Sequence, residues 1–143
     1  MTDVVSREVR SRIMARVRSK DTKPEMMVRR LLHGLGYRYR LHRSDLPGRP
    51  DLVFPRRSKI VFVHGCFWHS HSDCPNVRLP TSNQDYWSSK LESNKERDKR
   101  NLRQLESAGW MTTVVWECEL GDLESVASRL VAFLGNSASY SAH

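Results

Sequence analysis

The residues 61–74, which read VFVHGCFWHSHSDC, concentrate side chains that could do chemistry. Two histidines, His69 and His71, lie between two cysteines, Cys66 and Cys74, and two large aromatic residues separate Cys66 from His69. Thiolates and imidazoles are preferred zinc ligands, and a neutral imidazole can also act as a base. A structural core needs no such mixture, so we interpret this stretch as a functional site.

The cysteines indicate a structural zinc site. The chain has three cysteines, and the third, Cys118, follows a later predicted strand. Together with one imidazole they form a closed tetrahedral set that leaves no coordination position open: Cys66, His71, Cys74 and Cys118. Spacing alone leaves open whether His69 or His71 supplies the nitrogen. The alternative is that Cys118 is a buried apolar thiol and the other residues are incidental.

A carboxylate upstream indicates hydrolytic chemistry. Asp51 follows the turn sequence LPGRP and opens a short predicted strand. A divalent cation held by this carboxylate would polarise a phosphate and stabilise the leaving oxygen. Since imidazole titrates near neutral pH, His69 could take a proton from the attacking water. His64 and Glu25 are further candidates, although a strand-end histidine and a helix cap would explain them equally simply.

Three short strands are expected around Asp51, at residues 37–42, 51–54 and 60–64. A basic turn at 55–59 would join the last two strands as a hairpin. If Phe54 pairs with Ile60, Asp51 lies opposite Val63, whose carbonyl oxygen could share the cation. A slip of one residue would turn every side chain to the other face of the sheet.

Helical patterns surround these strands. A helix starts near Thr22, and a longer one is predicted at 83–108, followed by a buried strand at 111–116 and a closing helix at 123–134. The long helix has an inward stripe at helical spacing: Trp87, Leu91, Asn94, Asp98, Leu102 and Leu105. A carboxylate on such a stripe either serves a site or pairs with Arg97, Lys99 or Arg100. The order of elements predicts an α/β fold in one domain, with a mixed β-sheet flanked by helices and parallel strands around the long helix.

The composition points to a polyanionic partner. The 143 residues carry a formal net charge of +8 with 28% charged residues. Residues 1–20 form a basic arm with a helix candidate at 6–20, which is either an ordinary surface helix or one that lies along phosphates. We expect a cytosolic protein because no apolar run reaches about 20 residues and no signal peptide precedes the arm. The tail 136–143 is expected to be frayed.

Several segments in order resemble the very-short-patch repair endonucleases, a family of the restriction-endonuclease-like superfamily. These segments are DTKPE, LPGRPDLVF, VHGCFWHSH, NKERDKR and GWMTTVVWECEL, of which HGCFWH with VWEC is the most specific. The resemblance implies a restriction-endonuclease-like fold with a structural zinc site. It also implies a magnesium-dependent enzyme that nicks double-stranded DNA on the 5′ side of the mispaired thymine at T:G mismatches. Such mismatches arise by deamination of 5-methylcytosine.

The resemblance also implies roles for single residues. Asp51 would be the magnesium carboxylate, the Val63 carbonyl would meet the same ion, and His69 would be the general base. The supporting active-site positions would be Glu25, His64 and Asp98. The zinc ligands would be Cys66, His71, Cys74 and Cys118. The residues that contact DNA would be Phe67, Trp68 and Trp87 as wedges beside the mismatch and, in the arm, Arg7, Arg10, Arg12 and Arg16.

Two rival functions and some departures accompany this interpretation. Val63 lacks the hydroxyl group found in the best-studied members of the family, and the superfamily's usual second acid and lysine are absent. Trp87 lies on the predicted core stripe and could simply pack there, whereas Phe67 and Trp68 in a polar loop have less core to enter. We expect a monomer that hands its product to other repair proteins. The rivals are a zinc-stabilised DNA-binding module without catalysis and a restriction-type nuclease that ignores mismatches.

Overall fold

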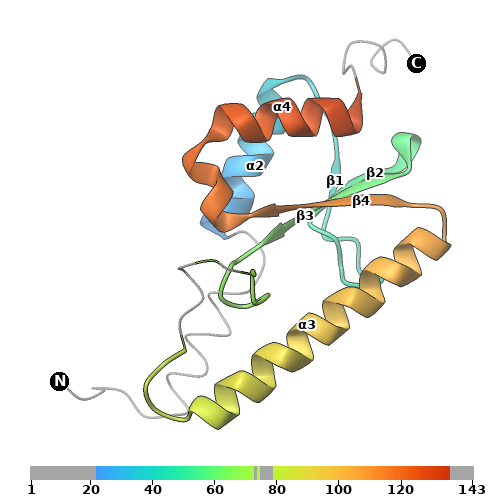
Figure 1. Ribbon diagram of the computed structural model, residues 1–143. Coiled ribbons are helices and arrows are strands. Elements are labelled where there is room, and N and C mark those ends of the chain that lie inside the picture. The colour runs from blue at the N-terminus through green and yellow to red at the C-terminus, as the bar shows by residue number, and fades with distance from the viewer. Residues whose placement is uncertain (1–21, 73, 75–78, 136–143) are drawn as a thin grey trace.

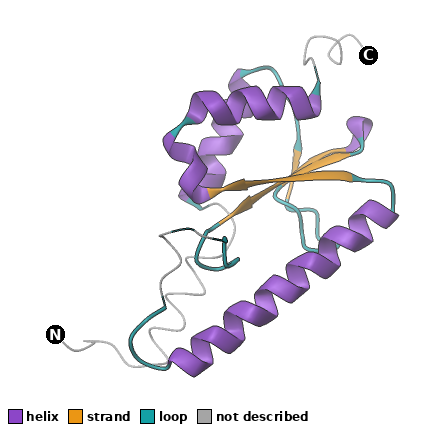
Figure 2. Cartoon of the chain, viewed as in Figure 1, coloured by secondary structure: helices purple, strands orange, loops and turns teal. Residues whose placement is uncertain are grey.

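The structure is a computed structural model that describes residues 22–72, 74 and 79–135. The predicted arm with its helix and its arginines (Arg7, Arg10, Arg12 and Arg16), and the tail, lie outside the described residues. The described chain forms a mixed sheet in the order β1-β2-β3-β4, with helices on both faces (Figure 1, Figure 2). The prediction of a mixed β-sheet flanked by helices is therefore confirmed. None of the described helices is both long and apolar enough to cross a lipid bilayer.

The described elements follow the predicted order. They are α2 (Lys23–Gly34), β1 (Arg40–Leu41), β2 (Leu52–Phe54), β3 (Lys59–His64), α3 (Gln84–Ser107), β4 (Met111–Trp116) and α4 (Leu123–Leu134). The strand expected at 37–42 is wrong except for its two residues in β1. The amide of Tyr37 donates to the Leu32 carbonyl at the end of α2, so this residue belongs to the helix end rather than to the sheet.

The central strands are buried on both faces because helices cover both. One core joins α2 and α4 to the sheet through Leu52, Phe54, Val61 and Val115. The other core joins α3 to the opposite face through Val53, Ile60, Phe62 and Leu105. β4 is an edge strand in which only Val115 is fully buried, so the prediction of a buried strand there is wrong.

The pairing of the strands places Asp51 beside β3. β1, β2 and β3 form an antiparallel meander, and β4 pairs with β3 in parallel after the α3 crossover. The predicted hairpin register is wrong by one residue: Phe54 pairs with Lys59, because the turn closes at Ser58 in the left-handed conformation. The Asp51 carboxylate consequently meets the amide of Val63, which donates to Oδ2 at 2.7 Å.

Candidate active site and metal centre

The candidate residues gather at the end of the two parallel strands. β3 and β4 end side by side, where His64 pairs with Trp116. The loop that follows β3 lies beyond these ends (Figure 1). Loop side chains and strand-end side chains can therefore meet there, and they form three polar clusters and one aromatic cluster.

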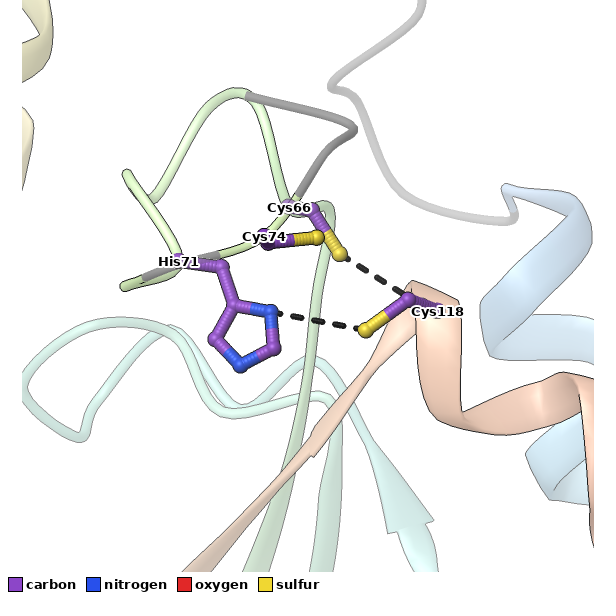
Figure 3. Close-up of side chains that lie close together, drawn as sticks. All are labelled: Cys66, His71, Cys74 and Cys118. Carbon is purple, nitrogen blue, oxygen red and sulfur yellow. Dashed lines mark hydrogen bonds between the residues drawn. The ribbon is translucent and has the colours of Figure 1, made fainter.

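The thiol cluster consists of Cys66, His71, Cys74 and Cys118. Their potential ligand atoms all lie within 4.8 Å of one another. Three of them come from the loop after β3, and Cys118 comes from the short 3-10 helix Glu117–Gly121 after β4, so the cluster ties the loop to the sheet (Figure 3). The Sγ of Cys118 lies 3.4 Å from Nδ1 of His71, and the His71 ring stacks on Trp116 with centroids 4.1 Å apart.

The thiol cluster has the dimensions of a zinc site. Four tetrahedral ligands at zinc–sulfur and zinc–nitrogen distances lie about 3.3–3.8 Å apart, which the cluster can adopt with little movement. Burial, and then the neighbouring Cys66 and Cys74 thiols, raise the pKa of Cys118 to about 12, because a thiolate is disfavoured there unless a cation is present. The three cysteines are free of disulfides. The structure brings His71 rather than His69 into this cluster.

The histidine cluster consists of His64, His69 and Asp98. The two imidazole rings stack face to face with centroids 3.7 Å apart, and Nδ1 of His69 lies 2.5 Å from Oδ2 of Asp98. Asp98 therefore pairs with His69 rather than with an arginine or lysine of its own helix. Because a neutral His69 donates its Nδ1–H to this carboxylate, its Nε2 keeps a free lone pair. Burial, and then the neighbouring His69, hold the pKa of His64 well below its usual range, so that ring is neutral.

The carboxylate cluster consists of Glu25, His42 and Asp51, whose ligand atoms also lie within 4.8 Å of one another. Glu25 is 2% exposed and accepts hydrogen bonds from Arg29 and from Nε2 of His42. The main effect on Asp51 is burial, which raises its pKa to about 7; the nearby Glu25 acts in the same direction. The Val63 amide and the Arg29 guanidinium oppose this shift.

His42 and Arg29 are absent from the sequence-based site. Thr22 caps α2 by accepting from the Glu25 amide, as the sequence suggests, but the Glu25 side chain turns inward instead of completing a cap. The missed pairing lies in the first hairpin. Continuing its register places His42 directly opposite Asp51, and the His42 amide does donate to the Asp51 carbonyl. The long loop between His42 and Asp51 leaves no sequence signal that would predict this pairing.

The carboxylate and histidine clusters attach to consecutive residues of β3. Asp51 accepts from the amide of Val63, and the next residue, His64, stacks on His69. Both clusters are therefore anchored at the same end of β3. This is the juxtaposition that metal-assisted hydrolysis with a general base requires.

The aromatic cluster consists of Phe67, Trp68 and Trp87, with Leu91 beneath them. The expectation that Trp68 has little core to enter is wrong, since this side chain is 8% exposed and lies against Trp87 and Leu91. The buried Asn94 of α3 donates from Nδ2 to the Trp68 carbonyl at 3.2 Å. Helix α3 thus holds Trp68 through Asn94 and, one turn later, holds His69 through Asp98.

Comparison with known proteins agrees with this chemistry. A family model described as DNA mismatch endonuclease Vsr matches residues 2–76. The chain is 55% identical to the type II nicking enzyme V.XorIIP of Xanthomonas oryzae pv. oryzae over 91% of the chain and 95% of the relative. It is 43% identical to the type II nicking enzyme V.NmeAIP of Neisseria meningitidis, over 91% and 92%. It is 37% identical to the DNA mismatch endonuclease Vsr of Escherichia coli, over 90% and 82%.

These likenesses define first a class and then a family. The class is that of nicking endonucleases, which are DNA hydrolases, so DNA is the substrate. Within this class, the chain belongs to the Vsr family of DNA mismatch endonucleases.

Proposed function

We propose that this enzyme nicks one strand of duplex DNA on the 5′ side of the mispaired thymine at T:G mismatches produced by deamination of 5-methylcytosine. The observation that carries the proposal is the attachment of Asp51 and His69 to consecutive residues of β3, with His69 paired to Asp98. The name of the Escherichia coli relative supports mismatch specificity. We infer that the enzyme acts as a monomer in the bacterial cytoplasm.

The carboxylate cluster fits a magnesium ion. Asp51 and the Val63 carbonyl would hold it, with Glu25 beside them, and the ion would polarise the phosphate and stabilise the leaving oxygen. The fit rests on charge: two carboxylates lie close together in a buried place, and burial together with Glu25 raises the pKa of Asp51 although Arg29 opposes this shift. A divalent cation would supply the positive charge that Arg29 alone does not.

The histidine cluster fits general base catalysis. Nε2 of His69 would take a proton from the attacking water, because Nδ1 is occupied by its hydrogen bond with Asp98. Asp98 would stabilise the imidazolium that forms. The neutral His64 ring, stacked on His69, would keep the base in its place without adding a second charge.

The aromatic cluster fits the recognition of a mismatch. Phe67, Trp68 and Trp87 together present planar apolar rings that could replace base stacking where a mispaired step is opened. Since Trp68 and Trp87 are buried in the free chain, insertion would require the cluster to open. Zinc in the thiol cluster would hold the loop that carries Phe67 and Trp68 against the end of β4.

The test is a strand-resolved nicking assay. Duplexes of one sequence with T:G, T:A or C:G at one position are incubated with the zinc-loaded enzyme, with magnesium or with EDTA. We expect magnesium-dependent cutting of the thymine strand in the T:G duplex only. Equal cutting of matched and mismatched duplexes would favour a nicking enzyme that ignores mismatches. Binding without cutting at any magnesium concentration would favour a zinc-stabilised DNA-binding module.

A further inference from the structure

The carboxylate cluster contains a nitrogen donor. His42 directly follows β1, and its Nε2 lies 2.5 Å from Oε2 of Glu25. The side chain is 15% exposed, so it is held inside the cluster rather than in solvent. Its ligand nitrogen lies within 4.8 Å of the carboxylate oxygens of both Glu25 and Asp51. Two elements of the meander and one helix therefore direct three ligands to one place.

We propose that His42 is a direct ligand of the divalent cation in this site, which is then held by Glu25, His42 and Asp51. The proposal rests on the proposed function, because it concerns the same catalytic cation. An imidazole ligand favours transition metals such as Mn²⁺ over Mg²⁺, which prefers oxygen ligands alone. With His42 as a ligand, the site should prefer Mn²⁺ to Mg²⁺ more strongly than a site made of carboxylate and carbonyl oxygens alone.

The contacts around Glu25 support this assignment. The Glu25 oxygen and the His42 nitrogen lie 2.5 Å apart, so the ligand atoms of the two side chains already point toward each other. Two neighbouring ligands of an octahedral ion lie about 2.9 Å apart, so a small side-chain rotation admits the ion. The guanidinium of Arg29 pairs with the same Glu25 oxygen and lies 3.3 Å from His42 Nε2. Positive charge already gathers at this point in the free chain.

The backbone fixes His42 in this position. The residue has a positive φ of 45°, which turns the chain away from β1, and its amide donates to the carbonyl of Asp51 at 3.3 Å. The same pairing that aligns the backbones brings the two side chains together. A merely exposed histidine would not need a left-handed conformation, which costs about 1 kcal/mol or more in a residue other than glycine.

The experiment uses Mn²⁺ as a spectroscopic probe. The full-length, zinc-loaded enzyme is titrated with Mn²⁺, free Mn²⁺ is counted by continuous-wave electron paramagnetic resonance, and bound Mn²⁺ is examined for ¹⁴N modulation by electron spin echo. Mn²⁺ is suitable because the thiol cluster prefers zinc and keeps it. We expect ¹⁴N modulation in the natural chain, its loss in His42→Gln, and a fall in Mn²⁺ affinity of about 10-fold or more, with a smaller fall for Mg²⁺.

Two control variants locate the nitrogen. His33→Gln changes an exposed histidine of α2, and His69→Gln changes the proposed base; both should keep the ¹⁴N modulation. Modulation that is missing from the natural chain, or that persists in His42→Gln, would overturn the assignment while leaving the magnesium site of Asp51 in place. Asp51→Asn separates the two proposals: if it leaves Mn²⁺ affinity unchanged, the cation does not bind at Asp51 and both proposals fail.

Discussion

The thiol cluster and the carboxylate cluster could each hold a divalent cation, but they differ in ligands and in charge balance. The thiol cluster offers three sulfurs and one nitrogen, which complete the coordination of zinc and leave no position for water or substrate. The carboxylate cluster offers oxygens with one nitrogen, and Arg29 already supplies a positive charge there. The first arrangement suits a permanent structural ion, and the second suits an exchangeable ion with positions open to a phosphate.

The largest expected effect comes from a substitution in the carboxylate cluster. Asp51→Asn keeps the size of the side chain but removes the charge that attracts the cation, so single-turnover nicking should fall by about 10³-fold or more. Zinc content and duplex binding should be retained. Asp45→Asn, a change at an exposed carboxylate in the preceding loop, should leave nicking unchanged. Loss of zinc or of fold in Asp51→Asn would assign this residue to structure instead.

A pair of histidine substitutions tests whether the two clusters are separate. His71→Gln removes a ligand of the thiol cluster, so the purified protein should lose most of its zinc and several kcal/mol of stability. His69→Gln, only two positions away, should keep the zinc and the melting temperature while nicking falls by about 10²–10³-fold. Metal analysis, thermal melting and nicking are measured on both variants. Zinc loss in His69→Gln with retention in His71→Gln would reverse the assignment.

The sequence predicted the long helix and the elements after it better than the elements before it. Helix α3, strand β4 and helix α4 were expected within a residue of their observed bounds, because each has a clear apolar period between turn residues. The strand expected at 37–42 failed because its alternating pattern reflects two different surroundings. Tyr37 packs at the end of α2, whereas Arg40 and Leu41 alone pair with β2. Periodicity cannot separate these causes.

The site was predictable where its residues are adjacent in the sequence or belong to a recognisable motif. Cys66, His71 and Cys74 lie in one loop, and Cys118 completes a set that uses all three cysteines of the chain. The resemblance to a known family selected His71 rather than His69. His42 was not predictable in this way, because its role depends on the register of a hairpin with a long loop. The hydrogen-bond partner of Asp98 was left open for a similar reason: helical spacing placed it inward but could not say that His69 would meet it.

A smaller effect is expected when the partner of the proposed base His69 is changed. Asp98→Asn can keep a hydrogen bond to Nδ1 of His69, but it removes the charge that stabilises the imidazolium and can favour the wrong tautomer. Nicking should fall by about 10²-fold, with zinc content and magnesium affinity unchanged. Glu96→Gln, at an exposed carboxylate on the same helix, is the matched control. A pH–rate profile that Asp98→Asn leaves unaltered in height and shape would contradict the assignment.

The smallest effect concerns the charge balance of the carboxylate cluster in the absence of magnesium. Folding raises the pKa of Asp51 from 3.8 to about 7, so the native chain binds more protons than the unfolded chain between these values. The contribution of Asp51 to stability is therefore most favourable below this window and falls as the pH rises through it. Between pH 6 and pH 8 this one group should remove about 1 kcal/mol of stability, or roughly 3–5 °C of melting temperature.

The variant Asp51→Asn isolates this contribution. The buried His64, whose pKa is lowered, gives the opposite trend, losing stability as the pH falls, but it is present in both proteins and cancels in their difference. Melting temperatures of the zinc-loaded natural chain and of Asp51→Asn are compared at pH 6 and pH 8 without magnesium. The advantage of the variant should grow with pH, because asparagine never carries the charge that burial disfavours. A constant difference would mean that Arg29 already balances the charge of Asp51. The carboxylate cluster would then resemble the thiol cluster in needing no exchangeable cation for its charge.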